Sequence, residues 1–313
     1  MAQHAVCYTA TAGYLFQTVL SAVQARAHTS RSSDVYVVFL GDPGSEELRL
    51  FGRVCADHGV RLLAAPASAI DGFHPMYARL FLDELLPESI EQVLYLDGDT
   101  QVVDDIDALV HADPPAKGAL AVRDPMVFIR RADEGFRRKI DGWWDSSGIP
   151  ADVRDRYVNS GVLRIARDDI RELRADILAM SAGATTRFPD QDAINISLED
   201  RIDVVSMSWN FPGFLLGTQF VELTPPRIIH FMSDPRPWNA ALPPWGPERH
   251  RPYADLVDRY PDVADYWTRL TGLRKAKYAL QQRYKHLTER RTWQSSAAAR
   301  ALQELERDTR DLA

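Results

Sequence analysis

The chain has 313 residues, a formal net charge of −7 and 45% hydrophobic residues. This length suits one large α/β domain or a domain with an appendage, and the hydrophobic content is enough for a sizeable core. The acidic balance argues against a protein that binds nucleic acid.

The N-terminus gives no sign of export. Met1–Tyr8 lacks the basic and apolar regions of a secretory signal, and no stretch approaches roughly 18 consecutive apolar residues. The two cysteines, Cys7 and Cys55, lie on separate predicted elements, so we expect neither a disulfide framework nor a thiolate metal site. Together these features predict a cytoplasmic protein.

Strand and helix patterns alternate along the first hundred residues. Their rhythm predicts a mainly parallel sheet with helices on both faces, in which ligands bind at the carboxyl ends of the strands. The predicted strands are Ala5–Tyr8, Asp34–Leu40, Arg61–Ala65 and Gln92–Leu96; a Thr9–Gly13 turn follows the first, and the helices are Tyr14–His28, Ser45 to about His58, and Met76–Leu85.

Two aspartates follow the strand Gln92–Leu96. Gly98 separates Asp97 from Asp99, and strand alternation points both carboxylates to the same side. Like charges this close repel, and a hard divalent cation between them relieves both the repulsion and the cost of desolvation. We expect Gly98 to remove side-chain bulk where a ligand approaches the backbone. A structural turn is the alternative for so short a motif.

A second polar segment is predicted near two later strands. Asp124 stands at the mouth of a strand at Ala119–Val122, and Asn159 and Ser160 are expected just before a strand at Gly161–Ile165. On local grounds alone, a turn or a cap is the favoured explanation of the Asn-Ser pair.

Two further candidates lie closer to the C-terminus. We expect Asp190 to be the N-cap of the helix that includes Ala193–Leu198, with Asp192 in its first turn. His230 interrupts a run that reads as buried, and a histidine satisfied within the core is the alternative to a metal ligand there.

The composition changes from Thr271 onward. We therefore predict a main domain at residues 1–250 and a helical extension at 251–313, which is basic over 271–300. We expect this extension to lie against an anionic membrane at the inner face, and to be removable from Gly272 onward without unfolding the main domain. The alternative is a tail that packs Tyr278 and Tyr284 on the main domain, or a dimer contact. The basic residues are Arg274, Lys275, Lys277, Arg283, Lys285, Arg290 and Arg291, interleaved with Leu273, Tyr278, Leu280, Tyr284 and Leu287.

Taken together and in order, these motifs resemble glycosyltransferase family 8, which includes bacterial lipooligosaccharide galactosyltransferases and glycogenin. The resemblance runs from about Val6 to Trp238. It implies a GT-A (Rossmann-like) fold and a retaining, metal-dependent transfer of a hexose from a nucleotide sugar to a glycan or lipid-linked saccharide acceptor. The motifs are Asp-Gly-Asp at 97–99, Asn-Ser-Gly at 159–161, Pro-Asp-Gln-Asp at 189–192, Ile-Ile-His-Phe at 228–231 and Pro-Arg-Pro-Trp at 235–238.

The resemblance also implies roles for individual residues. Asp97, Asp99 and His230 would bind Mn²⁺ or Mg²⁺, and Arg236, where the family usually has lysine, would reach the diphosphate. Because a neutral amide is a poor nucleophile, we expect Gln191 to assist substitution on the front face of the sugar. Arg79 and Asp124 would position the donor sugar, and Asn159, Asp190 and Gln191 would line the reaction centre.

One segment departs from the family pattern. The family's first strand ends in an Asp/Asn-rich turn that holds the base and ribose, whereas Thr9, Thr11 and Tyr14 are the polar residues available here. UDP-hexose is the donor that the resemblance implies, and the base is left open. A sugar nucleotidyltransferase is disfavoured because no glycine-rich phosphate loop follows the first strand. A non-catalytic nucleotide- or glycan-binding descendant stays open.

Overall fold

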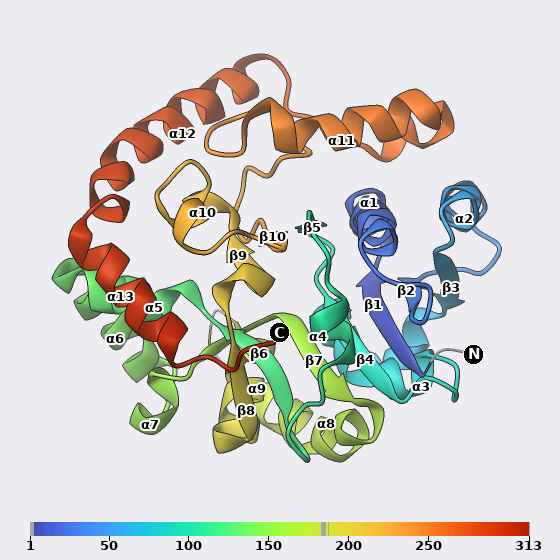
Figure 1. Ribbon diagram of the computed structural model, residues 1–313. Helices are drawn as coiled ribbons and strands as arrows, with labels where there is room; N and C mark the ends of the chain where they lie inside the picture. The colour runs from blue at the N-terminus through green and yellow to red at the C-terminus, as the bar shows by residue number, and fades with distance from the viewer. Residues whose placement is uncertain (1–2, 183–185, 187, 313) are drawn as a thin grey trace.

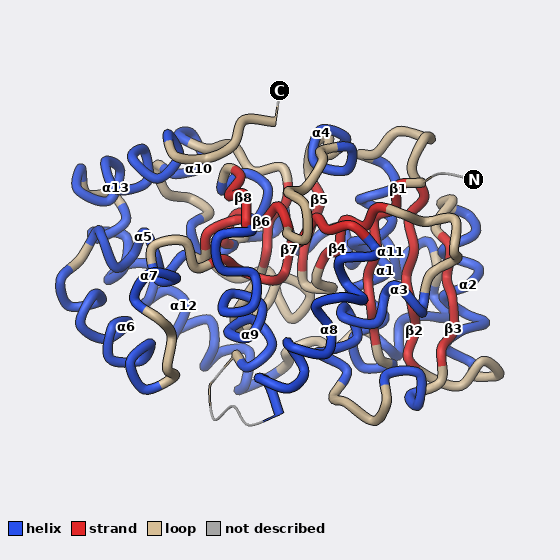
Figure 2. The backbone as a smooth tube through the Cα atoms, turned by 90° about the horizontal axis from the view of Figure 1, so that it is seen from below, coloured by secondary structure: helices blue, strands red, loops and turns tan. Residues whose placement is uncertain are grey.

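The computed structural model describes residues 3–182, 186 and 188–312. Within these residues, a seven-stranded sheet in the order β3-β2-β1-β4-β7-β6-β8 forms the centre, and β5, β10 and β9 form a small second sheet (Figure 2). The strands are β1 His4–Ala10, β2 Asp34–Leu40, β3 Arg61–Ala65, β4 Gln92–Leu96, β5 Thr100–Val102, β6 Ala119–Arg123, β7 Val158–Ala166, β8 Ile202–Val205, β9 Phe211–Pro212 and β10 Ile228–His230.

Helices cover both faces of the large sheet, as the sequence predicts (Figure 1). The α-helices are α1 Ala12–Ala27, α2 Glu46–Asp57, α3 Leu82–Leu85, α4 Asp107–His111, α5 Pro125–Ala132, α6 Glu134–Ser146, α7 Ala151–Arg154, α8 Arg167–Ala182, α9 Pro189–Leu198, α10 Phe220–Leu223, α11 Gly246–Arg259, α12 Gly272–Trp293 and α13 Ser296–Arg307. The 3₁₀ helices are η1 Ala67–Ile70, η2 Pro75–Phe81, η3 Glu199–Arg201, η4 Met207–Asn210, η5 Gly213–Leu215 and η6 Pro261–Tyr266.

The sheet is mainly parallel, which confirms the predicted fold class. Strands β1, β2, β3 and β4 pair in parallel, as do β6 and β8. Strand β7 runs antiparallel to both of its neighbours, β4 and β6. The start of β7 therefore lies at the same edge as the carboxyl end of β4.

Alternation along the strands builds one apolar core on each face. In β1, Val6 and Tyr8 belong to the cluster beneath α1, while Ala5 and Cys7 belong to the cluster on the opposite face, beside α8 and α9. This is the pattern of a strand buried on both sides. Cys7 and Cys55 are both free and buried, so the expectation of no disulfide framework holds.

Several boundaries differ from the sequence prediction. Pairing with β2 extends β1 to Ala10, so Thr9 lies in the strand and the Thr9–Gly13 turn shrinks to Thr11. The predicted helix Met76–Leu85 consists of η2 followed by the short α3. Pairing with β6 across a register shift extends β7 back to Val158, so Asn159 and Ser160 lie inside the strand.

The C-terminal helices wrap back onto the main body. Helix α11 lies near α1, α12 arcs away, and α13 returns beside α5 (Figure 1). Trp293 and Leu302 belong to the same apolar core as β1 and α1, and the Arg310 N–H donates to the Val204 carbonyl at 2.7 Å. The expectation that residues from Gly272 onward can be removed without unfolding is therefore wrong. The division at residue 250, which falls inside α11, stays a prediction.

We expect Leu302→Ala to lower the free energy of unfolding by about 2–5 kcal/mol, because Leu302 is 2% exposed and its removal leaves a cavity between α13 and the main body. The matched control is Leu273→Ala on α12, whose leucine is 91% exposed and should change stability by less than about 0.5 kcal/mol. Denaturant unfolding measures both. Equal stability of the two variants would contradict the packing of α13.

Candidate active site

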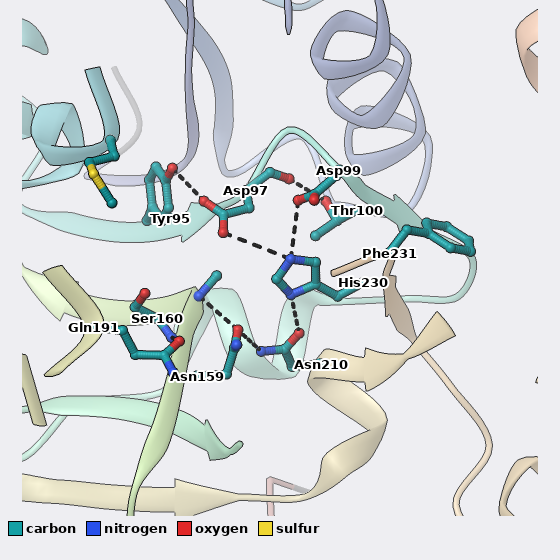
Figure 3. Close-up of polar contacts among 12 residues, drawn as sticks. Tyr95, Asp97, Asp99, Thr100, Asn159, Ser160, Gln191, Asn210, His230 and Phe231 are labelled. Atoms are coloured by element: carbon teal, nitrogen blue, oxygen red, sulfur yellow. Dashed lines mark hydrogen bonds and ion pairs between the residues drawn. The ribbon is translucent and has the colours of Figure 1, made fainter. Parts of the chain in front are cut away.

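Three polar side chains from two chain segments meet at the carboxyl edge of the large sheet. Asp97 and Asp99 follow β4 directly. Strand β10 pairs antiparallel with β5, which places His230 opposite Thr100 and therefore beside the two aspartates. The sequence prediction that Asp97, Asp99 and His230 come together agrees with this arrangement, which Figure 3 shows.

The geometry of this group suits a divalent cation. One ligand atom from each of Asp97, Asp99 and His230 lies within 4.8 Å of the others. His230 Nε2 is 3.1 Å from Asp99 Oδ1 and 3.8 Å from Asp97 Oδ2. Two carboxylate oxygens and one imidazole nitrogen are ligands that Mn²⁺ and similar ions accept. A Cβ at Gly161 would lie 2.3 Å from His230 Cε1, so only glycine leaves this space open.

A second layer of amides fixes the orientation of His230. Asn210 donates through its amide NH₂ to Asn159 Oδ1 at 3.0 Å, so its carbonyl oxygen faces His230 Nδ1, 2.9 Å away. With Nδ1 donating to this oxygen, Nε2 faces the carboxylates, which is the arrangement typical of histidine metal ligands.

Charge compensation shapes the ionisation of the same group. Burial opposes the charged imidazole, but the carboxylates of Asp99 and Asp97 raise the pKa of His230 above its ordinary value. Burial likewise opposes ionisation of Asp99, and His230 and Arg236 hold its pKa below its usual range. A metal ion bound here would take the place of the imidazole proton.

Arg79 joins three elements beneath the carboxylates. Its guanidinium lies 3.1 Å from Asp97 Oδ1 and 3.5 Å from Asp190 Oδ2, and it donates to the Ser160 carbonyl at 2.7 Å. Asp190 is therefore not the N-cap of α9, as predicted, because Phe188 occupies that position and the Asp190 carboxylate turns to Arg79. The predicted contact of Arg79 with the donor sugar stays a prediction.

A hydrogen-bonded network holds Gln191 in one orientation. Its Oε1 accepts from the Ser160 N–H at 3.1 Å, and its Nε2 donates to Asp124 Oδ2 and to the Tyr157 hydroxyl, both at 3.2 Å. Asn159 donates to the same Asp124 oxygen at 3.1 Å. Asp124 also caps α5, and burial raises the pKa of its carboxyl. The structure thus brings Asp124, Asn159 and Gln191 together.

Of the expected nucleotide-binding residues, Arg236 contacts the metal group directly. Arg236 Nε is 3.2 Å from Asp99 Oδ2, and its guanidinium lies over the rings of Tyr14 and Trp238. Burial and the nearby Asp99 carboxylate raise the pKa of Tyr14 to about 12. Thr9 and Thr11 lie at the end of β1, beside β4 in the sheet.

The close packing of α1 requires a glycine at position 98, whether or not a ligand approaches the backbone there. A Cβ at this position would lie 2.1 Å from the Thr18 Oγ1 of α1. The glycine therefore lets α1 pack closely against the loop that carries the two aspartates, and a contact of its backbone with ligand stays a prediction.

The sequence analysis missed several residues that support the site. Asn210 ends η4, twenty positions before His230, and no motif marks it. Tyr157 donates through its hydroxyl to Asp192, and Tyr95 donates to Asp97 Oδ1 at 2.7 Å. The available signal was a polar residue inside an otherwise apolar run, which does not identify its partner.

Comparisons with known proteins identify the family of the chain. Residues 63–241 match the model of glycosyl transferase family 8. A probable galacturonosyltransferase-like protein 4 of Arabidopsis thaliana is 44% identical over 218 residues, which are 66% of this chain and 57% of that protein. The lipopolysaccharide glucosyltransferase WaaO of Escherichia coli K12 is 24% identical over 260 residues, covering 75% of this chain and 72% of WaaO. The chain thus spans little more than half the length of the plant relative.

Solved structures show the same fold. A galactosyltransferase LgtC, in complex with donor and acceptor sugar analogs, superposes with a TM-score of 0.61 at 22% identity, over 84% of this chain and 98% of LgtC. The bifunctional glycosyltransferase WbbM gives a TM-score of 0.66 at 17% identity, over 84% of this chain and 51% of WbbM. The predicted GT-A fold is confirmed. Since the family model matches more than half of the residues, the chain belongs to glycosyltransferase family 8.

Proposed function

We propose that the protein is a retaining glycosyltransferase that moves a hexose from a nucleotide-sugar donor to a hydroxyl of a glycan or lipid-linked saccharide. One observation carries the proposal: the group Asp97, Asp99 and His230 adjoins the Gln191 network at the carboxyl edge of the sheet. This edge is where α/β folds bind nucleotides. The relatives' names, which include galacturonosyltransferase-like and lipopolysaccharide glucosyltransferase, support a hexose donor and a glycan acceptor.

The donor diphosphate would lie between the metal group and Arg236. Asp97, Asp99 and His230 would hold Mn²⁺ or Mg²⁺, which when bound supplies positive charge against the diphosphate. Arg236 would add a planar cation on the other side, and its cluster with Tyr14 and Trp238 would flank the base. UDP-hexose fits this description, with the base left open by the Thr9–Tyr14 segment.

Retention is the outcome that the family resemblance implies, and the way Gln191 is held supports it. Both ends of its amide are engaged by Ser160, Asp124 and Tyr157, so it serves better as an oriented dipole than as a nucleophile. In the proposed step, the bond between the anomeric carbon and the diphosphate oxygen breaks. The acceptor hydroxyl oxygen bonds to the same face of that carbon, and its proton passes to the departing diphosphate.

We expect Mn²⁺ to stabilise the wild-type protein against unfolding, by about 2.7 kcal/mol when the ion is present at 100 times its dissociation constant. Asp99→Asn should lose this stabilisation together with donor hydrolysis, because the ion loses a charged ligand. Asp262→Asn is the control, since Asp262 pairs with Arg53 on the surface, away from the site. Thermal unfolding and nucleotide release measure the two effects. Undiminished hydrolysis in EDTA would show that the metal assignment is wrong.

We expect NMR of the product to show the anomeric configuration of the donor. Gln191→Ala should lower kcat by about 10²-fold, comparable to the loss of one oriented transition-state donor, while the product configuration stays the same. Ser197→Ala, near the other end of α9, is the control and should leave kcat unchanged. Inversion would remove the role given to Gln191. Metal binding without any donor hydrolysis would favour the non-catalytic descendant.

We also propose a peripheral contact between the outer face of α12 and an anionic membrane. Among the described residues no helix is both long and apolar enough to cross a membrane. Leu273, Leu280, Tyr284 and Leu287 are 68–91% exposed, and their spacing places them on one face of the helix. The alternative of a packed tail therefore fails for Tyr284, whereas Tyr278 does pack against the core.

The basic residues of α12 favour an anionic membrane as the partner of its exposed apolar face. Five exposed cations of α12 accompany the apolar stripe: Arg274, Lys275, Lys277, Arg283 and Lys285. Each basic residue near an anionic surface contributes about 1 kcal/mol, and the leucines supply the apolar contact. The side chains of Arg290 and Arg291 lie outside the described residues.

We expect full-length protein to bind vesicles that contain anionic phospholipid at low ionic strength. A Leu280→Ser, Leu287→Ser double variant should bind them several-fold more weakly, because it removes apolar contact without touching the buried side of α12. The control is Ser296→Ala on α13, outside the stripe. Vesicle co-sedimentation measures the binding. Wild-type protein that ignores these vesicles would exclude the membrane contact.

A further inference from the structure

A cavity of about 240 Å³ lies between α12 and the segment that follows His230. We call it the α12 pocket. Its wall includes the aromatic rings of Phe231, Trp245 and Trp293, and α12 contributes Gln282, Lys285 and His286. The volume is below the roughly 300–1,000 Å³ of pockets for drug-sized ligands, so the pocket suits a single sugar ring.

One polar group of this pocket, the indole N–H of Trp293, is buried without a partner, and the side chain of Gln282 has no hydrogen-bond partner among the described residues. Gln282 is 7% exposed. The indole N–H of Trp245, by contrast, donates to the Ala240 carbonyl at 2.9 Å. Buried polar groups are normally paired, and the exceptions need an explanation. A ligand with hydroxyl groups would pair both.

The charge of the α12 pocket is opposite to that of the whole protein. Lys285 and His286 are the ionisable side chains among its described lining residues, and none of these lining residues is a carboxylate. Neither has a salt-bridge partner within the described part of the chain. In a chain of net charge −7, this arrangement favours an anionic ligand.

The pocket adjoins the metal group through one shared backbone segment. Phe231 follows His230, and its N–H donates to the Asp99 carbonyl at 2.9 Å. A Cβ at Gly213 would lie 2.5 Å from the Phe231 ring and 3.3 Å from the His230 carbonyl. The Phe231 side chain points away from the Asp97, Asp99 and His230 group (Figure 3). A ligand in the pocket therefore lies outside the metal group, next to the segment that carries His230.

We infer that the α12 pocket binds an acidic saccharide unit, a sugar bearing a carboxylate or a phosphate, as the part of the acceptor distant from the reacting hydroxyl. The apolar face of the sugar packs on the aromatic wall, Gln282 and the Trp293 N–H pair with hydroxyls, and Lys285 pairs with the anion. This inference rests on the proposed transferase function. It makes α12 a determinant of acceptor specificity.

Binding of saccharides in the absence of donor tests the inference directly. The probes are a galacturonate disaccharide, a phosphate-bearing disaccharide and a neutral disaccharide, measured by titration calorimetry. We expect at least one acidic probe to bind wild-type protein more tightly than the neutral one. Lys285→Gln should weaken that binding about tenfold, the effect of losing one hydrogen bond to a charged group. Lys277→Gln, on the same helix but outside the pocket lining, should leave it unchanged.

The kinetic readout distinguishes specificity from folding and from failure of the function itself. In Lys285→Gln, KM for the acidic acceptor should rise about tenfold while donor hydrolysis and KM for the donor stay the same. Equal binding of neutral and acidic probes, or equal effects of both lysine variants, would overturn the inference with the proposed function intact. Absence of donor hydrolysis in wild-type protein would overturn the function, and the binding measurement would still report on the pocket.

Discussion

The guanidinium of Arg79 is the interaction on which the candidate site depends. Buried beneath the sheet edge, it contacts Asp97 after β4, Asp190 at the start of α9 and Ser160 in β7. Each of these groups would be costly to bury alone, and the two carboxylates would repel each other. Burial disfavours the charged arginine, but the surrounding carboxylates raise the pKa of Arg79 above its ordinary value. One cation thus fixes the relative positions of three elements that are far apart in the sequence.

The antiparallel direction of β7 places Ser160 within reach of the Arg79 guanidinium. In a fully parallel sheet, Asn159 and Ser160 would start a strand at the edge opposite the aspartates. Because β7 runs antiparallel to β4 and β6, its first residues lie where those strands end. Asn159 can then reach both Asp124 and Asn210, and through Asn210 it orients His230. The metal group and the Gln191 network are consequently coupled through a strand whose polarity the alternation of elements did not reveal.

Features that depend on neighbouring residues could be predicted from the sequence, whereas contacts between residues far apart in the sequence could not. Strand periodicity located β2, β3 and β4 to the residue, because that pattern is local. The Asp97, Asp99 and His230 group was found through the order of several motifs along the chain, and its residues do lie together. Asp190 was misassigned as a cap because capping is the local explanation, whereas its partner Arg79 is more than a hundred positions away. Asn210 and Tyr157 carry no local signal, since their importance lies in what they contact across the sheet.

The two faces of α12 illustrate why composition alone could not assign the C-terminal segment. Its basic and apolar residues interleave in the sequence, yet the helix sorts them, with Leu280 and Leu287 outside and Gln282 inside. The segment also packs on the main body, because Trp293 at its end is part of the core that includes β1. The aromatic wall of the α12 pocket is therefore built from the same residue that anchors the helix. An unpaired buried polar group costs about 1–3 kcal/mol, so a fold that keeps the Trp293 N–H unpaired at this wall is less stable than one with an apolar replacement. Such a loss of stability is characteristic of binding sites, where polar groups that are unpaired in the free protein form hydrogen bonds with the ligand.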